Sequence, residues 1–183
     1  MIDLNFSPFP VLETERIRLR KMTRDDADEI YFLRSDPRVM RYIDRIPAKN
    51  VEDAIIYIDD MNARMDRNEV ILWAITLRPD TKLVGYVCLW RIERGNYRCE
   101  VGYMLHPALH RKGIMTETLK TVLDFSFNTL KFHSITAGIN PANEASKLLL
   151  ESLGFKQEAY FRESFYFNGK FIDTVFFSII SPV

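Results

Sequence analysis

The chain has 183 residues, 47% of them hydrophobic, and its 25 lysines and arginines balance its 25 aspartates and glutamates. This length suits one well-buried core, so we expect a single domain over residues 1–183. A formal charge of zero gives no support to a nucleic-acid or anionic-lipid partner. The sequence shows neither a secretory signal pattern nor the ~18 consecutive apolar residues of a membrane span, so we expect a soluble cytoplasmic protein.

The amino-terminal third predicts one strand and two helices. Residues 15–21 alternate between polar and apolar side chains, which favours a strand whose arginines are solvated. Asp25 and Asp26 open an apolar-periodic run that ends before Pro37, as expected for a short helix with acids in its first turn. A second helical pattern covers residues 51–68. Its apolar face, with a spacing typical of core packing, consists of Ala54, Ile55, Ile58, Met61 and Met65.

Three antiparallel strands are predicted in the middle of the chain. Residues 70–77 and 82–92 are rich in β-branched and aromatic residues and are separated by a turn signal, so we expect a hairpin. Residues 97–105 continue the sheet. Cys88 and Cys99 fall on neighbouring strands, but a tight turn at residues 94–96 would keep the two thiols out of register. We therefore interpret them as reduced packing residues, without a disulfide or a metal.

The last third alternates between helices and strands. Residues 113–130 predict an amphipathic helix, residues 134–139 a buried strand, and residues 143–153 a helix closed by Gly154. A final hairpin of residues 155–167 and 171–180 is expected to turn at Asn168 and Gly169. The chain thus predicts about seven strands and about four helices.

The segment from His110 to Met115 is the candidate phosphate loop. It lies between a strand and an amphipathic helix, where unpaired N–H groups and the helix dipole face an anion. Gly113 permits close backbone approach or a positive φ angle, and Arg111 and Lys112 add positive charge, so a diphosphate would fit. The alternative is that Gly113 only starts the helix and the basic pair is solvated. The seven glycines complete no P-loop or dinucleotide pattern, which removes the usual support for ATP, GTP or NAD.

Two blocks resemble the cofactor-binding half of the GCN5-related N-acetyltransferase (GNAT) family. The first runs from Glu100 to Leu105 and continues through the hexapeptide to Thr116 and Glu117. In it, Gly113 matches the family's first glycine, but His110 replaces an arginine or glutamine and Met115 replaces a small residue. The second block comprises residues 140–146 and 151–155.

This resemblance implies the α/β (α+β) GNAT fold, with a mixed, mostly antiparallel sheet flanked by helices. It also implies acetyl-CoA as cosubstrate and an amine as acceptor, and it points to the branch of ribosomal-protein N-terminal acetyltransferases. The pantetheine arm would lie between splayed strands at residues 97–105 and 134–139. The residues that the resemblance assigns to acetyl-CoA are Tyr103, Met104, Leu105, His110, Arg111, Lys112, Gly113, Ile114, Met115, Thr116 and Asn143.

Two residues are candidates for proton transfer. Glu100 stands where many relatives carry a carboxylate that takes the amine proton through water; the alternative is a solvated glutamate paired with Arg98 or Lys82. Ser146 is the candidate acid, because the helix tyrosine of many relatives is replaced here by Leu150. Its alternative is a helix-surface or capping hydroxyl. We expect no metal, since the three histidines do not form a His-Glu-x-x-His pattern.

The sequence leaves several acceptors, and several roles for the protein, open. A weakly placed base suits an N-terminal α-amine, whose pKa of ~7.8 leaves it partly neutral at pH 7, better than a lysine at ~10.4. Small amines are the second possibility, and a catalytically degenerate acyl-CoA-binding module or a nucleic-acid binder are further alternatives. The acceptor site would be bordered by residues 43–49 and by the aromatic residues of the last hairpin, which could equally be core or homodimer contacts: Tyr160, Phe161, Tyr166 and Phe167.

Overall fold

The computed structural model describes residues 1–182, which contain one eight-stranded sheet with the order β1-β2-β3-β4-β5-β6-β8-β7. All neighbouring strands in it are antiparallel except β5 and β6. The strands are β1 (Leu12–Glu13), β2 (Ile17–Arg20), β3 (Ile71–Leu77), β4 (Leu83–Glu93), β5 (Arg98–Leu105), β6 (Ser134–Ile139), β7 (Lys156–Phe167) and β8 (Lys170–Ile180). The mixed, mostly antiparallel sheet expected from the sequence is confirmed.

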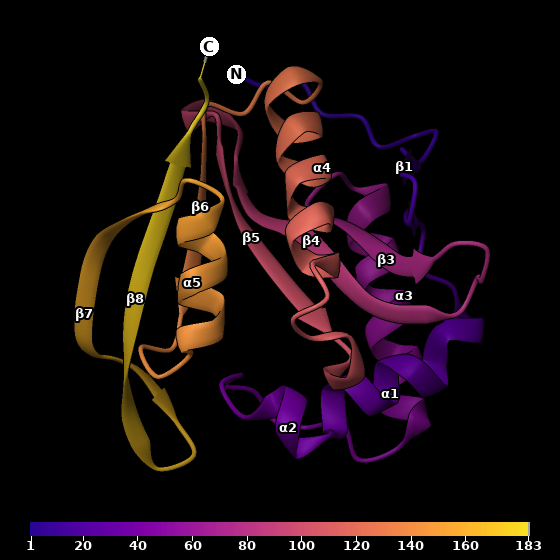
Figure 1. Ribbon diagram of the computed structural model, residues 1–183, viewed down its shortest axis with the longest axis horizontal. Coiled ribbons are helices and arrows are strands. Elements are labelled where there is room, and N and C mark those ends of the chain that lie inside the picture. Colours follow the sequence, from indigo (N-terminus) through magenta and orange to yellow (C-terminus); the bar gives the residue numbers. More distant parts are fainter. Residues whose placement is uncertain (183) are drawn as a thin grey trace.

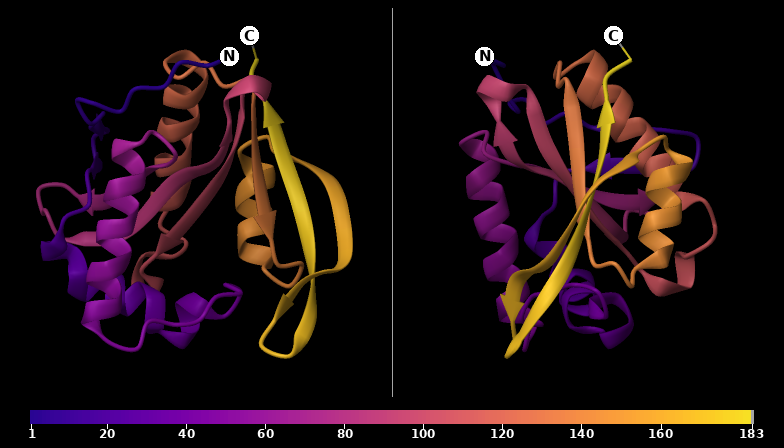
Figure 2. Two further views of the ribbon diagram at one scale, coloured as in Figure 1. Left: turned by 180° about the vertical axis from the view of Figure 1, so that it is seen from behind. Right: turned by 90° about the vertical axis from the view of Figure 1, so that its left-hand side faces the viewer.

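Five α-helices cover the two faces of this sheet within residues 1–182. They are α1 (Ala27–Ser35), α2 (Pro37–Met40), α3 (Val51–Asp66), α4 (Ile114–Asn128) and α5 (Glu144–Ser152). Helices α4 and α5 pack on one face, and α1 and α3 pack on the other (Figures 1 and 2). The methionine-rich face of α3 is buried, as predicted, with Ala54, Ile58, Met61 and Met65 in the core. No helix of the described chain combines the length and apolar character needed to cross a membrane.

Two short elements were not predicted from the sequence. Strand β1 has two residues, and Leu12 pairs with Leu19, which is too short a run for a periodic pattern to show. Helix α2 begins at Pro37, the residue that ends the α1 pattern. Proline suits the first turn of a helix because its missing N–H would be unpaired there, and the Asp36 side chain caps this helix by accepting from the Arg38 amide. The same proline therefore ends one helix and starts another.

Strands β5 and β6 are hydrogen-bonded only at their first residues. Arg98, Cys99 and Glu100 pair with Ser134, Ile135 and Thr136, and then the two strands part. Pairing of β5 with β4 continues to its last residue, so residues 101–105 have a strand on one side and a widening gap on the other. The parting is visible in Figure 1, where α4 and α5 both begin toward its open end.

The two cysteines are packing residues, as expected. Cys88 lies opposite Gly102, whereas Cys99 lies opposite Ile135, and both thiols are free. Burial raises the pKa of both thiols, that of Cys88 to about 12. A thiol kept protonated in this way is a poor nucleophile.

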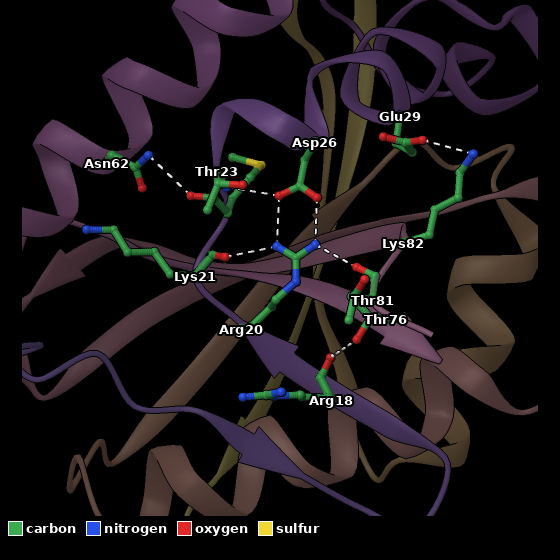
Figure 3. Close-up of polar contacts among 11 residues, drawn as sticks. Arg18, Arg20, Lys21, Thr23, Asp26, Glu29, Asn62, Thr76, Thr81 and Lys82 are labelled. Carbon is green, nitrogen blue, oxygen red and sulfur yellow. Dashed lines mark hydrogen bonds and ion pairs between the residues drawn. The ribbon is translucent and has the colours of Figure 1, made fainter. Parts of the chain in front are cut away.

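Arg20 is not the solvated side chain that the strand pattern predicted. Its guanidinium donates two hydrogen bonds to the buried Asp26 carboxylate, at 2.6 and 2.8 Å (Figure 3). It also donates to the carbonyl oxygens of Lys21 and Thr81. Asp26 in turn accepts from the Thr23 amide in a capping box at the start of the helix. This pair therefore holds the first helix against β2 and the β3–β4 turn.

We expect Asp26→Ala to lower the free energy of unfolding by about 3 kcal/mol, because it leaves the half-buried Arg20 guanidinium without its counter-ion and removes a helix cap. Urea titration followed by far-ultraviolet circular dichroism measures this change. Arg24→Ala is the matched control, since Arg24 forms an exposed ion pair with Asp59, and its unfolding midpoint should stay close to that of the wild type. Equal midpoints for the two variants would contradict the structural role of the Arg20–Asp26 pair.

Candidate active site

The predicted phosphate loop lies at the open end of the gap between β5 and β6, before α4. Gly113 has φ 75° and is the N-cap of the helix, and Arg111 has φ 61°, so the backbone turns sharply through two left-handed residues. Arg111, Lys112 and Gly113 are exposed. The free amides of the first helical turn and the positive end of the helix dipole therefore face solvent beside two basic side chains, an arrangement that accommodates a diphosphate.

Each of the two departures from the family pattern contacts the body of the domain, although His110 is exposed as a whole. The ring of His110 turns back toward the sheet, with Nε2 at 3.1 Å from the carbonyl oxygen of Leu105, the last residue of β5. Met115 is 8% exposed and packs into the core beside Ile114. The backbone of the loop thus keeps its shape with neither an arginine at 110 nor a small residue at 115.

Arg16, which the strand pattern placed among solvated side chains, instead holds this loop in position. Its guanidinium donates to Glu117 Oε2 on α4 at 2.6 Å and to the Lys112 carbonyl oxygen at 3.3 Å. Thr14 donates to the other oxygen of the same carboxylate at 2.5 Å. Burial opposes ionisation of Glu117, but these hydrogen bonds outweigh it and lower the pKa of the carboxyl. Arg16 and Glu117 are 101 positions apart, so no local pattern could have paired them.

Glu100 is the buried carboxylate at the point where β5 and β6 part. It is 8% exposed, and its Oε2 lies 3.1 Å from Arg91 Nη1. Burial raises the pKa of Glu100, and the Arg91 guanidinium opposes that rise. The ion-pair partners considered from the sequence were wrong: Arg98 pairs with Glu93, and Lys82 with Glu29.

A bulge in β4 brings Arg91 to this carboxylate. The register of β4 against β5 shifts between Trp90 and Glu93, and Arg91 within it has φ 47°. A sequence pattern cannot reveal such a bulge because one extra residue reverses the side-chain alternation after it. The residue that faces Glu100 therefore follows from the strand pairing.

Positive charge surrounds Glu100 on the face covered by α1 and α3. Trp90 lies opposite Glu100 in the register, and the guanidinium of Arg91 sits over its indole ring at 4.3 Å from the centroid. Arg45, from the loop that the sequence placed near the acceptor, lies over the same ring at 5.5 Å. The distances fit cation–π contacts, which hold both arginines beside the carboxylate.

A groove of about 530 Å³ runs over β6 and β8 next to Glu100. Thr136, the pairing partner of Glu100, is one of its lining residues. The others include Arg98, Phe161, Phe176 and Ser178. Of the four hairpin aromatics expected at the acceptor site, Phe161 lines this groove. Tyr160 also lies on β7 and bonds to Asp173, and Tyr166 packs against Phe171 near the hairpin turn.

Ser146 lies across the gap from Glu100, on the face covered by α4 and α5. Its amide donates to Asn143 Oδ1 at 3.2 Å, so Asn143 caps α5 and the Ser146 hydroxyl is not the cap. Tyr103 of β5 lies beside Ser146, and Leu150 is fully buried one turn further along the helix. Because alternate residues of a strand point to opposite faces, the side chains of Tyr103 and Glu100 lie on opposite faces of the sheet beside the gap.

The sequence comparison identifies one family over most of the chain. Residues 16–156 match the model of the acetyltransferase (GNAT) domain. The N-acetyltransferase YoaA of Bacillus subtilis is 33% identical over 174 residues, which cover 95% of this chain and 98% of YoaA. Spermidine N(1)-acetyltransferase of Escherichia coli is 24% identical and covers 87% of this chain and 83% of its own length.

Solved structures share the fold over nearly the whole chain. Ribosomal-protein-S5-alanine acetyltransferase from Vibrio fischeri has a TM-score of 0.83 at 25% identity, covering 94% of this chain and 97% of its own. The ribosomal L7/L12 α-N-protein acetyltransferase RimL, solved in complex with coenzyme A, has a TM-score of 0.85 at 16% identity, covering 93% and 98%. The latter similarity establishes the fold.

We expect Arg16→Ala to weaken coenzyme A binding roughly tenfold, equivalent to about 1.4 kcal/mol, because the phosphate loop loses a nearby positive charge and its hydrogen bond to the segment before β2. Isothermal titration calorimetry with coenzyme A measures this change. Arg18→Ala is the matched control: Arg18 lies two residues further along, on β2, but pairs with Glu13, so its variant should bind within twofold of the wild type. Unchanged affinity in Arg16→Ala would refute the role of this arginine.

Proposed function

This chain belongs to the acetyltransferase (GNAT) family and is an N-acetyltransferase, and we propose that it transfers the acetyl group of acetyl-CoA to the α-amine of a protein or peptide. The observation that carries this proposal is the buried Glu100 at the parting of β5 and β6, with a largely apolar groove on one face and the basic loop on the other. An acceptor amine and a thioester could then meet in the gap from opposite sides.

The residues present suit acetyl-CoA as cosubstrate. Its diphosphate would lie against the amides that follow Gly113, with Arg111, Lys112 and Arg16 supplying positive charge. Its pantetheine arm would run along the free edge of residues 103–105, where strand β5 offers peptide groups that β6 does not use. Bound there, acetyl-CoA supplies the thioester whose carbonyl carbon the amine attacks.

In this proposal Glu100 removes a proton from the acceptor amine. An ammonium group has no lone pair, so a base must act before or during attack on the thioester. Burial raises the pKa of Glu100 and makes it a stronger base than an exposed glutamate, while the Arg91 guanidinium limits that rise. The carboxylate would reach the amine through a water molecule, because it sits at the closed end of the gap.

Local charge favours a peptide over a polyamine. Arg45 and Arg91 both lie over Trp90 beside the base, and two guanidinium groups repel a polycation such as spermidine. A peptide brings a single positive charge at its N-terminus, and its α-amine loses that charge near pH ~7.8. The groove lined by Phe161, Phe176 and Ser178 then offers apolar and polar surface for the following residues.

A small amine is the second candidate acceptor, and the spermidine acetyltransferase among the relatives is the observation that favours it. The two candidates are separated by one assay of thiol release from acetyl-CoA. We expect turnover with a tripeptide that has a free N-terminus, and little with its N-formylated form or with spermidine. Faster turnover with spermidine than with any free-amine peptide would refute the peptide proposal.

We expect Glu100→Gln to lower kcat with a peptide acceptor about a hundredfold, because it removes the base but keeps the shape of the side chain. Coenzyme A affinity, measured by calorimetry, should change less than twofold. In the wild type, kcat/KM should fall as the pH drops through the raised pKa of Glu100, since only the ionised carboxylate accepts a proton. If the variant keeps both the wild-type rate and this acidic limb, Glu100 is not the base.

A further inference from the structure

Tyr103 carries a buried hydroxyl group that has no hydrogen-bond partner among residues 1–182. Leaving a buried hydroxyl unpaired costs on the order of 1–3 kcal/mol, so folded proteins rarely do so without a reason. Two other buried polar atoms in the described chain also lack a partner, on Asn62 and Thr118. Asn62 satisfies its amide nitrogen on the Met22 carbonyl, and Thr118 is a buried residue within α4.

The position of Tyr103 distinguishes it from these two residues. It belongs to the part of β5 that has lost β6 as a neighbour, and its side chain projects to the face covered by α5. Ser146, in the first turn of that helix, is its polar neighbour. Leu150, on the next turn of the same helix, is fully buried and has no proton to give. The only hydroxyls that these three residues bring to this side of the gap are those of Tyr103 and Ser146.

We propose that the Tyr103 hydroxyl is the proton donor to the departing thiolate of coenzyme A, with Ser146 connecting it to solvent. This deepens the proposed function, since it rests on direct transfer of the acetyl group from the thioester. Tyr103, which the family resemblance assigned to cofactor contact, thereby gains a catalytic role. Ser146, the acid expected from the sequence, becomes a relay.

The proton balance of this step is complete with the groups present. The amine nitrogen forms its bond to the carbonyl carbon and loses a proton to Glu100 through water. The carbon–sulfur bond breaks and its electron pair goes to sulfur, which takes the proton of Tyr103. In the same step the Ser146 hydroxyl passes a proton to the Tyr103 oxygen and regains one from water. The proton that Glu100 received then returns to solvent and restores that water. The products are an acetylated amine and coenzyme A thiol.

Burial keeps the Tyr103 phenol protonated before the carbon–sulfur bond breaks. It raises the pKa of the phenol to about 12, with Ser146 opposing the shift. A thiolate is a weaker base than this phenolate, since free thiols have a pKa near ~8.5. The donor therefore stabilises the developing thiolate first by a hydrogen bond, and full transfer depends on the simultaneous supply of a proton through Ser146.

Tyr103→Phe tests the proposal because it removes only the unpaired hydroxyl and leaves the ring in place. We expect kcat with acetyl-CoA to fall at least tenfold, with the KM for acetyl-CoA within threefold of the wild type. The acetyl selenoester of coenzyme A should restore most of the lost rate, because a selenolate leaves without a proton more readily than a thiolate. Ser146→Ala should show a smaller loss of kcat and the same restoration.

Glu100→Gln is the matched control, since the selenoester should not restore its rate: the defect there lies on the amine side. The test follows the leaving group, so it is run with whichever amine the wild type acetylates. If the wild type acetylates another amine but no peptide, the peptide proposal is refuted, and the proton-donor role of Tyr103 is tested by the same measurement with that amine. Unchanged kcat in Tyr103→Phe, a rise in KM alone, or an equal loss with both esters would overturn the role of Tyr103.

Discussion

The parting of β5 and β6 after three paired residues is the constraint on which the rest of the site depends. Because the two strands are parallel, each is followed by a helix that returns along the same face, so α4 and α5 both begin at the open end of the gap. The phosphate loop and the first turn of α5 are thereby placed on one side of the gap. The strand edge between them keeps peptide groups that a closed sheet would use internally.

The two faces of the gap differ in chemistry, and the alternation of β5 assigns each residue to its face. Glu100 points toward Trp90, where Arg45 and Arg91 concentrate positive charge around a buried carboxylate. Tyr103 points to the other face, where a hydroxyl pair and an apolar leucine border the strand edge. An amine and a thioester that meet between these faces would find the proposed base and the proposed proton donor on opposite sides, so neither group could neutralise the other directly.

Two arginines of the strand region around β2 connect parts of the chain that are distant in sequence. Arg20 reaches across one face to Asp26 and fixes α1, and Arg16 reaches across the other to Glu117 and the phosphate loop (Figure 3 shows the first of these). Both arginines lie in a stretch whose alternation looks like an ordinary solvent-facing strand. Each arginine instead connects the amino-terminal region to one of the helical layers. These contacts fix the positions of loops on opposite faces of the sheet relative to each other.

The sequence by itself determined all but the shortest elements, their order and the conformation of the loop before α4, because periodicity, caps and Gly113 act over a few residues. It also located Glu100, Asn143 and the loss of a tyrosine at Leu150, since these depend on matched motifs. Only the tertiary structure decided which charged side chains form ion pairs. The partner of Glu100 depends on a bulge in β4, and that of Arg16 on a contact between residues 101 positions apart. The unpaired Tyr103 hydroxyl likewise follows from strand divergence, which arises from packing between elements and leaves no pattern along the chain.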